Sequence, residues 1–149
     1  MTKKPAVKTP KDCLAGCPEL NIYFSLHRVG LDVERISKII KLRPWRVWKK
    51  GENCTPHSTI KHKDNGWEYR LSAKKELFLD RVLKKLVTTL RKHEKQILKA
   101  IERTKPKVDV SICIYTTDEL IPSLYIPKSC VKQFAKFNAE VDIDFYLVE

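Results

Sequence analysis

Apolar and polar residues alternate along several short stretches of this chain, and each such stretch predicts a β-strand. Residues 19–28 are the clearest case, because Leu20, Ile22, Phe24 and Leu26 fall on one side of an extended chain. The same pattern predicts further strands at residues 45–49, 67–71, 108–115 and 141–148. Between them, apolar residues recur at spacings of three and four in residues 31–42, 74–103 and 125–138, which predicts amphipathic helices.

These elements follow one another in the order β-α-β-β-α-β-α-β, which favours a single α+β domain. We expect a mixed or antiparallel sheet with the helices packed on one face. Two strand–helix–strand units resemble each other, because moving the first by 95 positions puts Ile36 on Val131 and Ile39 on Phe134. We therefore predict that both units contribute to one sheet and that Ile36 and Val131 are both buried.

Capping and breaking residues indicate where the helices begin and end. Asp32 predicts a helix start, because its carboxylate can accept hydrogen bonds from free backbone N–H groups. Pro44 predicts that this helix has ended, and Ser72 is a candidate cap for the long helical stretch that follows. At 1.5 Å per residue that stretch would be about 45 Å long. Because this is long for a small domain, we expect a bend or break near residues 91–94.

The length of the chain and the composition of its first residues define the domain organisation. The chain has 149 residues, which suits one core and is too short for two. Residues 1–18 are rich in Lys, Pro and Thr and lack periodicity, so we predict a flexible basic tail there and a single α+β domain over residues 19–149. No stretch approaches the ~20 apolar residues of a membrane span. The first residues also lack the apolar stretch of a secretory signal, so we expect a cytoplasmic protein without membrane contact.

The cysteines do not form a framework of paired residues. There are five, an odd number, and without a secretory signal they predict reduced thiols and no disulfides. Cys13 and Cys17 with Cys54 and His57 are residue types that bind zinc, but their spacing is looser than in paired zinc knuckles. The sequence also lacks a glycine-rich phosphate loop and a nucleophile with a paired base. We therefore expect no metal, no cofactor and no catalytic residue, and we expect Cys113 and Cys130 to be small core residues.

The net charge of +12 is distributed unevenly along the chain. Residues 74–107 hold 12 basic and 4 acidic groups, a net +8, whereas residues 108–149 hold 3 basic and 7 acidic groups, a net −4. Such a distribution favours attraction to an anionic partner. However, 22 of the 30 basic residues are Lys, which recognises phosphate less specifically than Arg does. An ordinary solvated surface therefore explains the charge equally well.

Tryptophans and basic residues are interleaved in two neighbouring stretches, and they form the first candidate binding site. Its members are Arg43, Trp45, Arg46, Trp48, Lys49, Lys50, Trp67 and Arg70. Aromatic rings can stack on bases while cations neutralise phosphates. Strand alternation would direct Trp45 and Trp48 to opposite sides, so we expect at most one Trp and its flanking Arg to share a surface with a ligand. Alternatively, Trp48 and Trp67 anchor the core, and Trp48→Ala would then cost about 3–5 kcal/mol.

The same residues carry a family resemblance. The pattern L-x-P-x-x-x-W-x-K-G at Leu42, Pro44, Trp48, Lys50 and Gly51 is followed by Gly66-Trp67 and by Asp142-Ile143-Asp144-x-Tyr146. This combination resembles the bacterial domain-of-unknown-function family numbered 4279, over roughly residues 20–148. The resemblance implies a compact α+β domain and supplies no activity and no catalytic residues. The basic tail and the Lys-rich long helix depart from the family pattern.

Asp142 and Asp144 form the second candidate site. Two positions apart on a strand, they would lie on one face, about 6–7 Å from each other. Paired carboxylates can bind a hard cation or take part in acid–base chemistry. Alternatively, they pair with Arg46 or Arg70 across the sheet.

Three classes of function are compatible with these features. The preferred interpretation is a non-catalytic protein-binding module, such as an immunity-type or accessory protein with an unknown protein partner, because uneven charge and exposed sheet edges suit electrostatic capture. The alternative is nucleic-acid binding through a Lys-rich surface, which predicts a steep dependence of affinity on salt. An enzyme of unknown reaction is the least supported interpretation.

Overall fold

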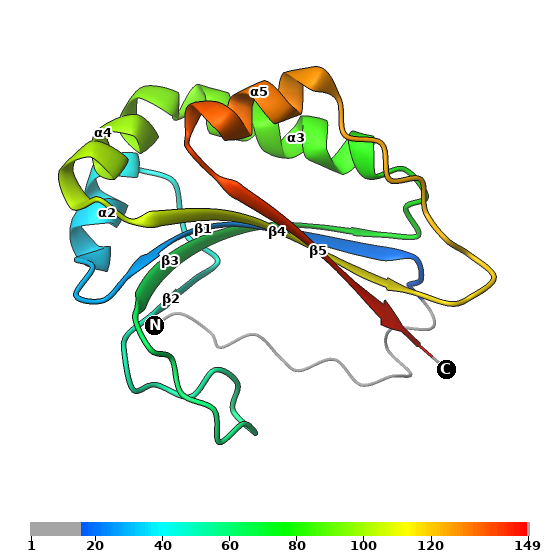
Figure 1. The fold of residues 1–149 in the computed structure, drawn as a ribbon, viewed down its shortest axis with the longest axis horizontal. Coiled ribbons are helices and arrows are strands. Elements are labelled where there is room, and N and C mark those ends of the chain that lie inside the picture. The colour runs from blue at the N-terminus through cyan, green and yellow to red at the C-terminus, as the bar shows by residue number, and fades with distance from the viewer. Residues whose placement is uncertain (1–15, 149) are drawn as a thin grey trace.

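The structure, a computed structural model, describes residues 16–148. Its strands are β1 (Glu19–Arg28), β2 (Arg46–Trp48), β3 (Asn65–Lys74), β4 (Lys107–Thr116) and β5 (Glu140–Leu147). Its helices are α2 (Val33–Ile40), α3 (Leu79–Lys92), α4 (Glu94–Thr104) and α5 (Lys128–Lys136). The predicted order of strands and helices is confirmed, with the long helical stretch divided into α3 and α4 (Figure 1).

The strands form one mixed sheet in the order β2-β3-β1-β4-β5. The central strand β1 pairs antiparallel with both β3 and β4, β2 pairs antiparallel with β3, and β4 pairs in parallel with β5. The two strand–helix–strand units therefore contribute to one sheet, as predicted. They differ in one respect: β4 and β5 are direct neighbours, whereas β3 lies between β1 and β2.

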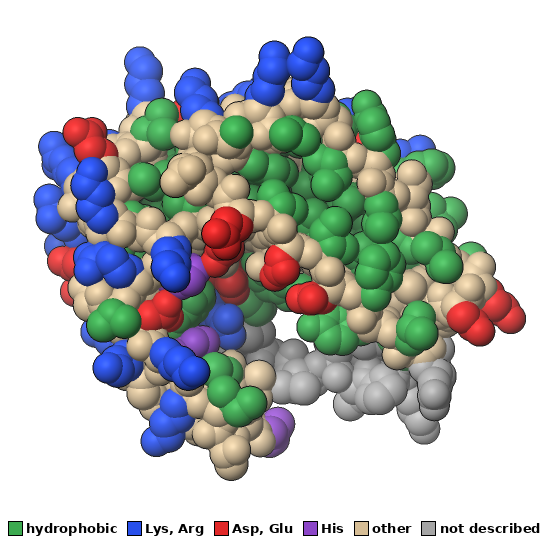
Figure 2. All heavy atoms as spheres, viewed as in Figure 1, with side chains coloured by type: hydrophobic (Ala, Val, Ile, Leu, Met, Phe, Trp, Pro, Cys, Tyr) green, Lys and Arg blue, Asp and Glu red, His purple; other side chains and the backbone are tan. Residues whose placement is uncertain are grey.

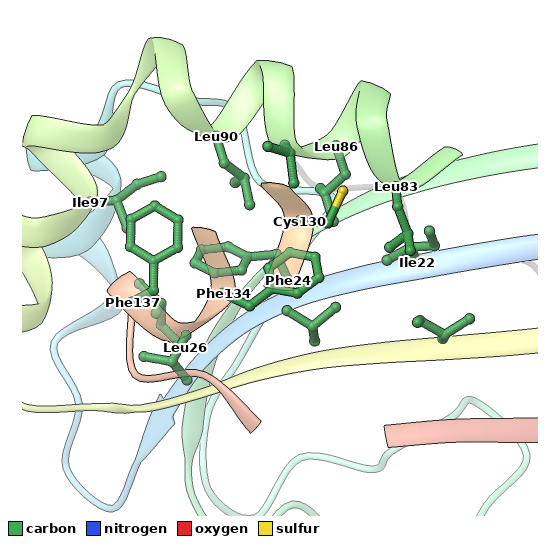
Figure 3. Packing of buried hydrophobic residues seen from close by; sticks show 14 of the residues in the cluster. Ile22, Phe24, Leu26, Leu83, Leu86, Leu90, Ile97, Cys130, Phe134 and Phe137 are labelled. Atoms are coloured by element: carbon green, nitrogen blue, oxygen red, sulfur yellow. The ribbon is translucent and has the colours of Figure 1, made fainter. Parts of the chain in front are cut away.

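The helices cover one face of the sheet, and the hydrophobic core lies between the two layers (Figure 1). Strand alternation places Leu20, Ile22, Phe24 and Leu26 of β1 on this face, where each is 0% exposed. Figure 3 shows Ile22, Phe24 and Leu26 beneath the apolar residues of the helices. The centroid of the Phe24 ring lies 5.6 Å from that of Phe137, which follows α5. The α+β class with helices on one face is therefore confirmed.

Helix α2 begins and ends where its capping residues indicate. Asp32 is the N-cap of α2, and its Oδ1 accepts a hydrogen bond from the backbone N–H of Arg35 at 3.0 Å. The helix ends at Ile40, because Lys41 adopts a left-handed conformation with φ of 56°. Pro44 follows three positions later, so the predicted stop is confirmed.

The predicted long helix breaks at His93, within the expected range. α3 ends at Lys92 and α4 begins at Glu94, and Nδ1 of His93 lies 3.2 Å from the carbonyl oxygen of Ile40. The predicted cap at Ser72 is wrong, because β3 continues to Lys74 and pairs with β1 along its whole length. Strand pairing has therefore displaced the helix start to Leu79.

The segment before β1 is bound to the segment after β3. The backbone N–H of Lys75 donates to the carbonyl of Gly16 at 2.8 Å, and that of Glu76 donates to the carbonyl of Pro18 at 3.0 Å. Residues 16–18 of the predicted tail are therefore hydrogen-bonded to the domain. The remainder of that tail, residues 1–15, lies outside the described residues.

The two strand–helix–strand units share a topology, but the predicted offset of 95 positions between them is wrong. Ile36 is 0% exposed, as predicted, but Val131 is 52% exposed, and the prediction that it is buried is wrong. The buried residues Ile36 and Ile40 of the first unit correspond to the buried residues Gln133 and Phe137 of the second. This correspondence is an offset of 97 positions. Both segments contain adjacent apolar residues, so a slip of two positions still matched several of them.

Candidate functional site

The face of the sheet opposite the helices is polar, and we call it the polar face. It is formed by the odd-numbered residues of β1, among them Tyr23, Ser25 and His27, together with their neighbours on the adjoining strands. Glu68 of β3 lies opposite Ser25, and Arg70 lies opposite Tyr23. The charged and polar side chains of these strands therefore lie mostly on one side of the sheet.

The predicted tryptophan and arginine cluster divides between the two faces. Trp67 is 0% exposed and belongs to the core under the helices, so its interpretation as a core anchor is confirmed. Trp45 and Arg46 lie on the polar face, where the Arg46 guanidinium is 5.5 Å from the Trp45 ring centroid and 4.9 Å from that of Trp48. The expectation that Trp45 and Trp48 point to opposite sides is wrong, because Arg46 contacts both rings. Trp45 precedes β2, so strand alternation does not constrain it.

Trp48 is buried on the polar face and is not part of the apolar core. Its Nε1 donates to Oδ1 of Asp64 at 3.1 Å, and its ring stacks on His62 with 5.0 Å between centroids. Beneath the ring lies Gly66, where an added Cβ would be only 2.0 Å from Cζ2 of Trp48. The interpretation that Trp48 anchors the core together with Trp67 is therefore wrong for Trp48.

The ring of Trp45 is also engaged by side chains of the chain itself. The Arg70 guanidinium lies 4.3 Å from its centroid, and the ring of Tyr23 lies 5.5 Å away. Cation–π contacts of this kind stabilise the arrangement by about 0.5–1 kcal/mol each at exposed sites. A nucleic-acid base would have to displace these contacts before it could stack on either tryptophan.

The remaining predicted basic residues lie outside this cluster. Arg43, Lys49 and Lys50 are exposed. Nζ of Lys49 lies 3.8 Å from a carboxylate oxygen of Glu34 on α2, and the backbone N–H of Lys50 donates to Oδ1 of Asn65 at 2.8 Å. These contacts are consistent with an ordinary solvated rim.

A buried carboxylate lies at the centre of the polar face. Oε2 of Glu68 accepts a hydrogen bond from the Ser25 hydroxyl at 2.7 Å, and Oε1 lies 3.4 Å from Nη2 of Arg46. Burial raises the pKa of Glu68 and outweighs the opposing effect of Arg46. No local spacing in the sequence indicates this group, because its partners Ser25 and Arg46 come from β1 and β2.

His27 is held between two carboxylates at one end of the polar face. Its Nδ1 lies 2.7 Å from Oδ2 of Asp64, and its Nε2 is in short contact with Oδ2 of Asp109. Burial lowers the pKa of His27, but the hydrogen bonds with Asp64 and Asp109 together raise it above its usual value. Both partners of His27 are distant in the sequence, so no local pattern indicates this contact.

His27 and Cys113, two potentially reactive groups of the polar face, are each in a state that limits their reactivity. Both ring nitrogens of His27 are occupied by carboxylates, so neither is available as a base for a nucleophile. Cys113 lies on the polar face and not in the core as predicted, and burial together with Asp144 and Asp142 raises its pKa to about 11. A thiol with that pKa is protonated at neutral pH and a poor nucleophile. Cys130, in contrast, is fully buried in the core, as expected.

Metal and disulfide chemistry are also not indicated by the described residues. Among them, no group of three or more His, Cys, Asp or Glu side chains is placed to hold a metal ion. Cys13 of the candidate zinc set lies outside the described part of the chain. No disulfide joins Cys17, Cys54, Cys113 and Cys130 to one another. None of the helices between residues 16 and 148 is long and apolar enough to cross a membrane.

Asp142 and Asp144 lie side by side on the polar face of β5, next to Ser111 and Cys113 of β4. With Glu140 they form what we call the acidic row, and all three are exposed. The alternative pairing with Arg46 or Arg70 is wrong. Those arginines lie on β2 and β3, and β1 and β4 separate them from β5.

The opposite side of β5 carries an exposed apolar row, which consists of Val141, Ile143, Phe145 and Leu147. Their exposed fractions are 43%, 37%, 46% and 69%. These side chains are on the same side of the sheet as the helices but are not covered by them. In Figure 2, acidic side chains follow the diagonal of β5, and a broad apolar patch lies directly beside them.

The apolar patch continues into the connection between β4 and α5. Four exposed apolar residues lie in that connection: Leu120, Ile121, Leu124 and Tyr125. In contrast, basic side chains gather over the helices at the top and left of Figure 2. The β5 side of the molecule is therefore acidic and apolar, although the whole chain carries a net charge of +12.

Comparison with known families identifies the chain. The family described as Domain of unknown function (DUF4279) matches residues 18–148, and the chain belongs to it. Trp48 and Gly66 are two of the motif residues noted above. They lie against each other across the β2–β3 pair, where a side chain at position 66 would clash with the Trp48 ring. Comparison with curated proteins gave no match, and neither did comparison with solved structures.

Proposed function

We propose that this member of the DUF4279 family is a non-catalytic protein-binding module, of the immunity or accessory type, that works in the cytoplasm and binds its partner along β5. The observation that carries the proposal is the apolar row of β5, which is exposed beside the acidic row. Contiguous exposed apolar surface is uncommon on monomeric proteins and usually marks an interaction site.

The two edges of the sheet differ in a way that supports this proposal. β2, at one edge, has only three residues, and a short strand is one of the usual means by which proteins protect a sheet edge. β5, at the other edge, has eight residues, every one of them exposed. An edge of that length and composition invites unwanted association unless it has a partner.

The charge of the β5 side favours a protein partner over nucleic acid. Glu140, Asp142 and Asp144 would repel phosphates at this surface. On the polar face, Trp45 and Trp48 are engaged by Arg46 and Arg70, so they offer no free stacking platform. Nucleic-acid binding by the lysines over the helices is retained as an outcome of the experiment.

The test is an affinity capture that compares the wild-type protein with two surface variants. Phe145→Ser removes the centre of the apolar row, and Ile60→Ser, at a 69% exposed residue of the connection between β2 and β3, is the matched control. Captures from a lysate of the source organism are run with and without nuclease, at about 50 mM and about 200 mM salt. Thermal unfolding checks that each variant is folded.

We expect a protein that survives nuclease treatment, is held by the wild type and by Ile60→Ser, and is lost with Phe145→Ser. Capture that disappears with nuclease or falls steeply between the two salt concentrations would favour nucleic-acid binding. A partner that Phe145→Ser holds as well as the wild type does would refute the role of β5.

A further inference from the structure

We propose that β5 accepts an extended protein segment in which apolar and basic side chains alternate, and that this segment adds a strand to the edge of the sheet. The proposal rests on the proposed function and names the chemistry of the partner. Its basis is the juxtaposition of three features on β5: a backbone edge without a neighbouring strand among residues 16–148, the acidic row and the apolar row.

The backbone of β5 offers hydrogen-bonding groups to a further strand. The N–H of Val148, directly after β5, donates to the carbonyl of Thr116 on β4 at 2.8 Å. Backbone N–H and C=O groups of successive residues point to opposite edges of a strand. The groups of Val141, Ile143 and Phe145 therefore point away from β4, toward the open edge of the sheet.

The acidic row specifies the charge of the added segment. On the polar face, Glu140 lies next to Asp109 of β4, and Asp142 lies next to Ser111. No Lys or Arg lies on this face in the stretch where β4 and β5 pair. Opposite charges on neighbouring strands are stabilising, and like charges are destabilising. A segment with Lys or Arg at every second position matches this row.

The apolar row specifies the other half of the pattern. In an added strand, the residues between the basic ones point to the side of the sheet that carries Ile143 and Phe145. Apolar side chains at those positions would cover the exposed surface of both residues. The alternation of two residue classes is therefore what distinguishes this partner from a generally basic or generally apolar peptide.

A second copy of this chain fits the edge less well than such a partner. In a symmetric antiparallel pair centred on Ile143, Asp142 of one copy lies opposite Asp144 of the other. Centred on Asp144, the two copies of that residue lie opposite each other. Both arrangements place like charges on directly opposite residues, so the acidic row disfavours pairing between copies in these two registers.

The experiment uses the full chain and labelled synthetic peptides as long as β5. In the basic peptide Lys and Val alternate, in the acidic peptide Glu and Val alternate, and a third peptide has the composition of the first with its Lys residues grouped at one end. Binding is measured by fluorescence anisotropy to the wild type and to the double variant Asp142→Lys with Asp144→Lys. Both positions are exposed, so the fold should tolerate the change.

We expect the wild type to bind the alternating basic peptide at least about tenfold more tightly than either other peptide. The double variant should reverse the preference and bind the acidic peptide. On addition of the basic peptide, hydrogen exchange of the Val141, Ile143 and Phe145 amides should slow, because they gain partners.

The failure of this inference is distinguishable from failure of the proposed function. Equal affinity for the alternating basic and acidic peptides, or a preference that the double variant does not change, would overturn strand addition. If protein capture still depends on Phe145 in that case, the partner covers the apolar row without pairing with the edge, and the proposed function stands. Absence of any Phe145-dependent capture overturns the proposed function itself.

Discussion

Replacing Gly66 by alanine should lower the free energy of unfolding by about 1–3 kcal/mol. The added Cβ would lie 2.0 Å from Cζ2 of Trp48, whereas ordinary contact begins at 3.4 Å, so the ring must retreat by about 1.4 Å. In retreating it weakens its hydrogen bond to Asp64 and its stacking on His62. A hydrogen bond to a charged group is worth about 1.5–3 kcal/mol, and an aromatic pair about 0.5–1.5 kcal/mol.

Gly66→Ala changes the free energy of unfolding through two effects of opposite sign. Alanine restricts the unfolded chain more than glycine does, which by itself would stabilise a strand by about 0.5–1 kcal/mol. The clash with Trp48 is larger and should decide the sign. In a Trp48→Ala background the clash is absent, so Gly66→Ala should there be neutral or slightly stabilising. The two substitutions are in contact and are therefore expected to be strongly non-additive.

The assay is urea unfolding of the four proteins of this double-mutant cycle, followed by circular dichroism. Gly16→Ala is the matched control, because its nearest contact is the flexible side chain of Lys74 at 3.2 Å, and it should change the free energy of unfolding by less than about 0.5 kcal/mol. An unchanged midpoint for Gly66→Ala, or an equal loss with and without Trp48, would refute the argument.

Three further predictions concern charge and burial. Because the pKa of His27 is raised in the folded protein, its contribution to stability is fully present below its unfolded pKa of about 6.5 and is lost as pH rises through its folded pKa. His27→Gln should remove this part of the pH dependence of the free energy of unfolding, measured by urea unfolding. An unchanged pH profile would contradict the prediction. Cys113, with a pKa of about 11, should be alkylated slowly at neutral pH, and Asp144→Asn should speed the reaction measured by mass spectrometry. Ile36→Ala should lower the free energy of unfolding by about 2–5 kcal/mol and Val131→Ala by less than about 0.5 kcal/mol, since only Ile36 is buried. Equal losses of stability in thermal unfolding would disprove the offset of 97 positions between the two strand–helix–strand units.

Periodicity was sufficient to predict the architecture, because burial of one face leaves a regular trace in the sequence. The even positions of β1 from Leu20 to Leu26 are apolar, and this alternation predicts the covered face directly. The break at His93 followed from the length of the helical stretch. The cap at Ser72 failed because pairing with β1 extends β3 beyond the apolar alternation, and local residue preferences do not report on such pairing.

The polar face was predicted only in part, because its contacts join residues far apart in the sequence. The interleaving of Trp45, Arg46 and Trp48 indicated a cluster, but their packing depends on Gly66, whose role emerges only when β2 lies against β3. Likewise, nothing near His27 in the sequence points to Asp109, which strand pairing brings into contact. The exposure of β5 was also missed, because an alternating pattern does not reveal whether a helix covers the apolar side.

The central position of β1 also has consequences for how this protein is made. β1 precedes the other four described strands in the sequence and leaves the ribosome before them. Its residue Ile22, however, pairs with Leu71 and Ile112, which are synthesised much later. Until β4 emerges, β1 has one edge without a neighbouring strand. The alternate side chains of β1 are fully buried in the finished domain. Folding therefore waits for non-local pairing, which is slow and exposes the nascent chain to aggregation. Chaperone protection during translation should matter more for this domain than for one whose strands pair in the order of their synthesis.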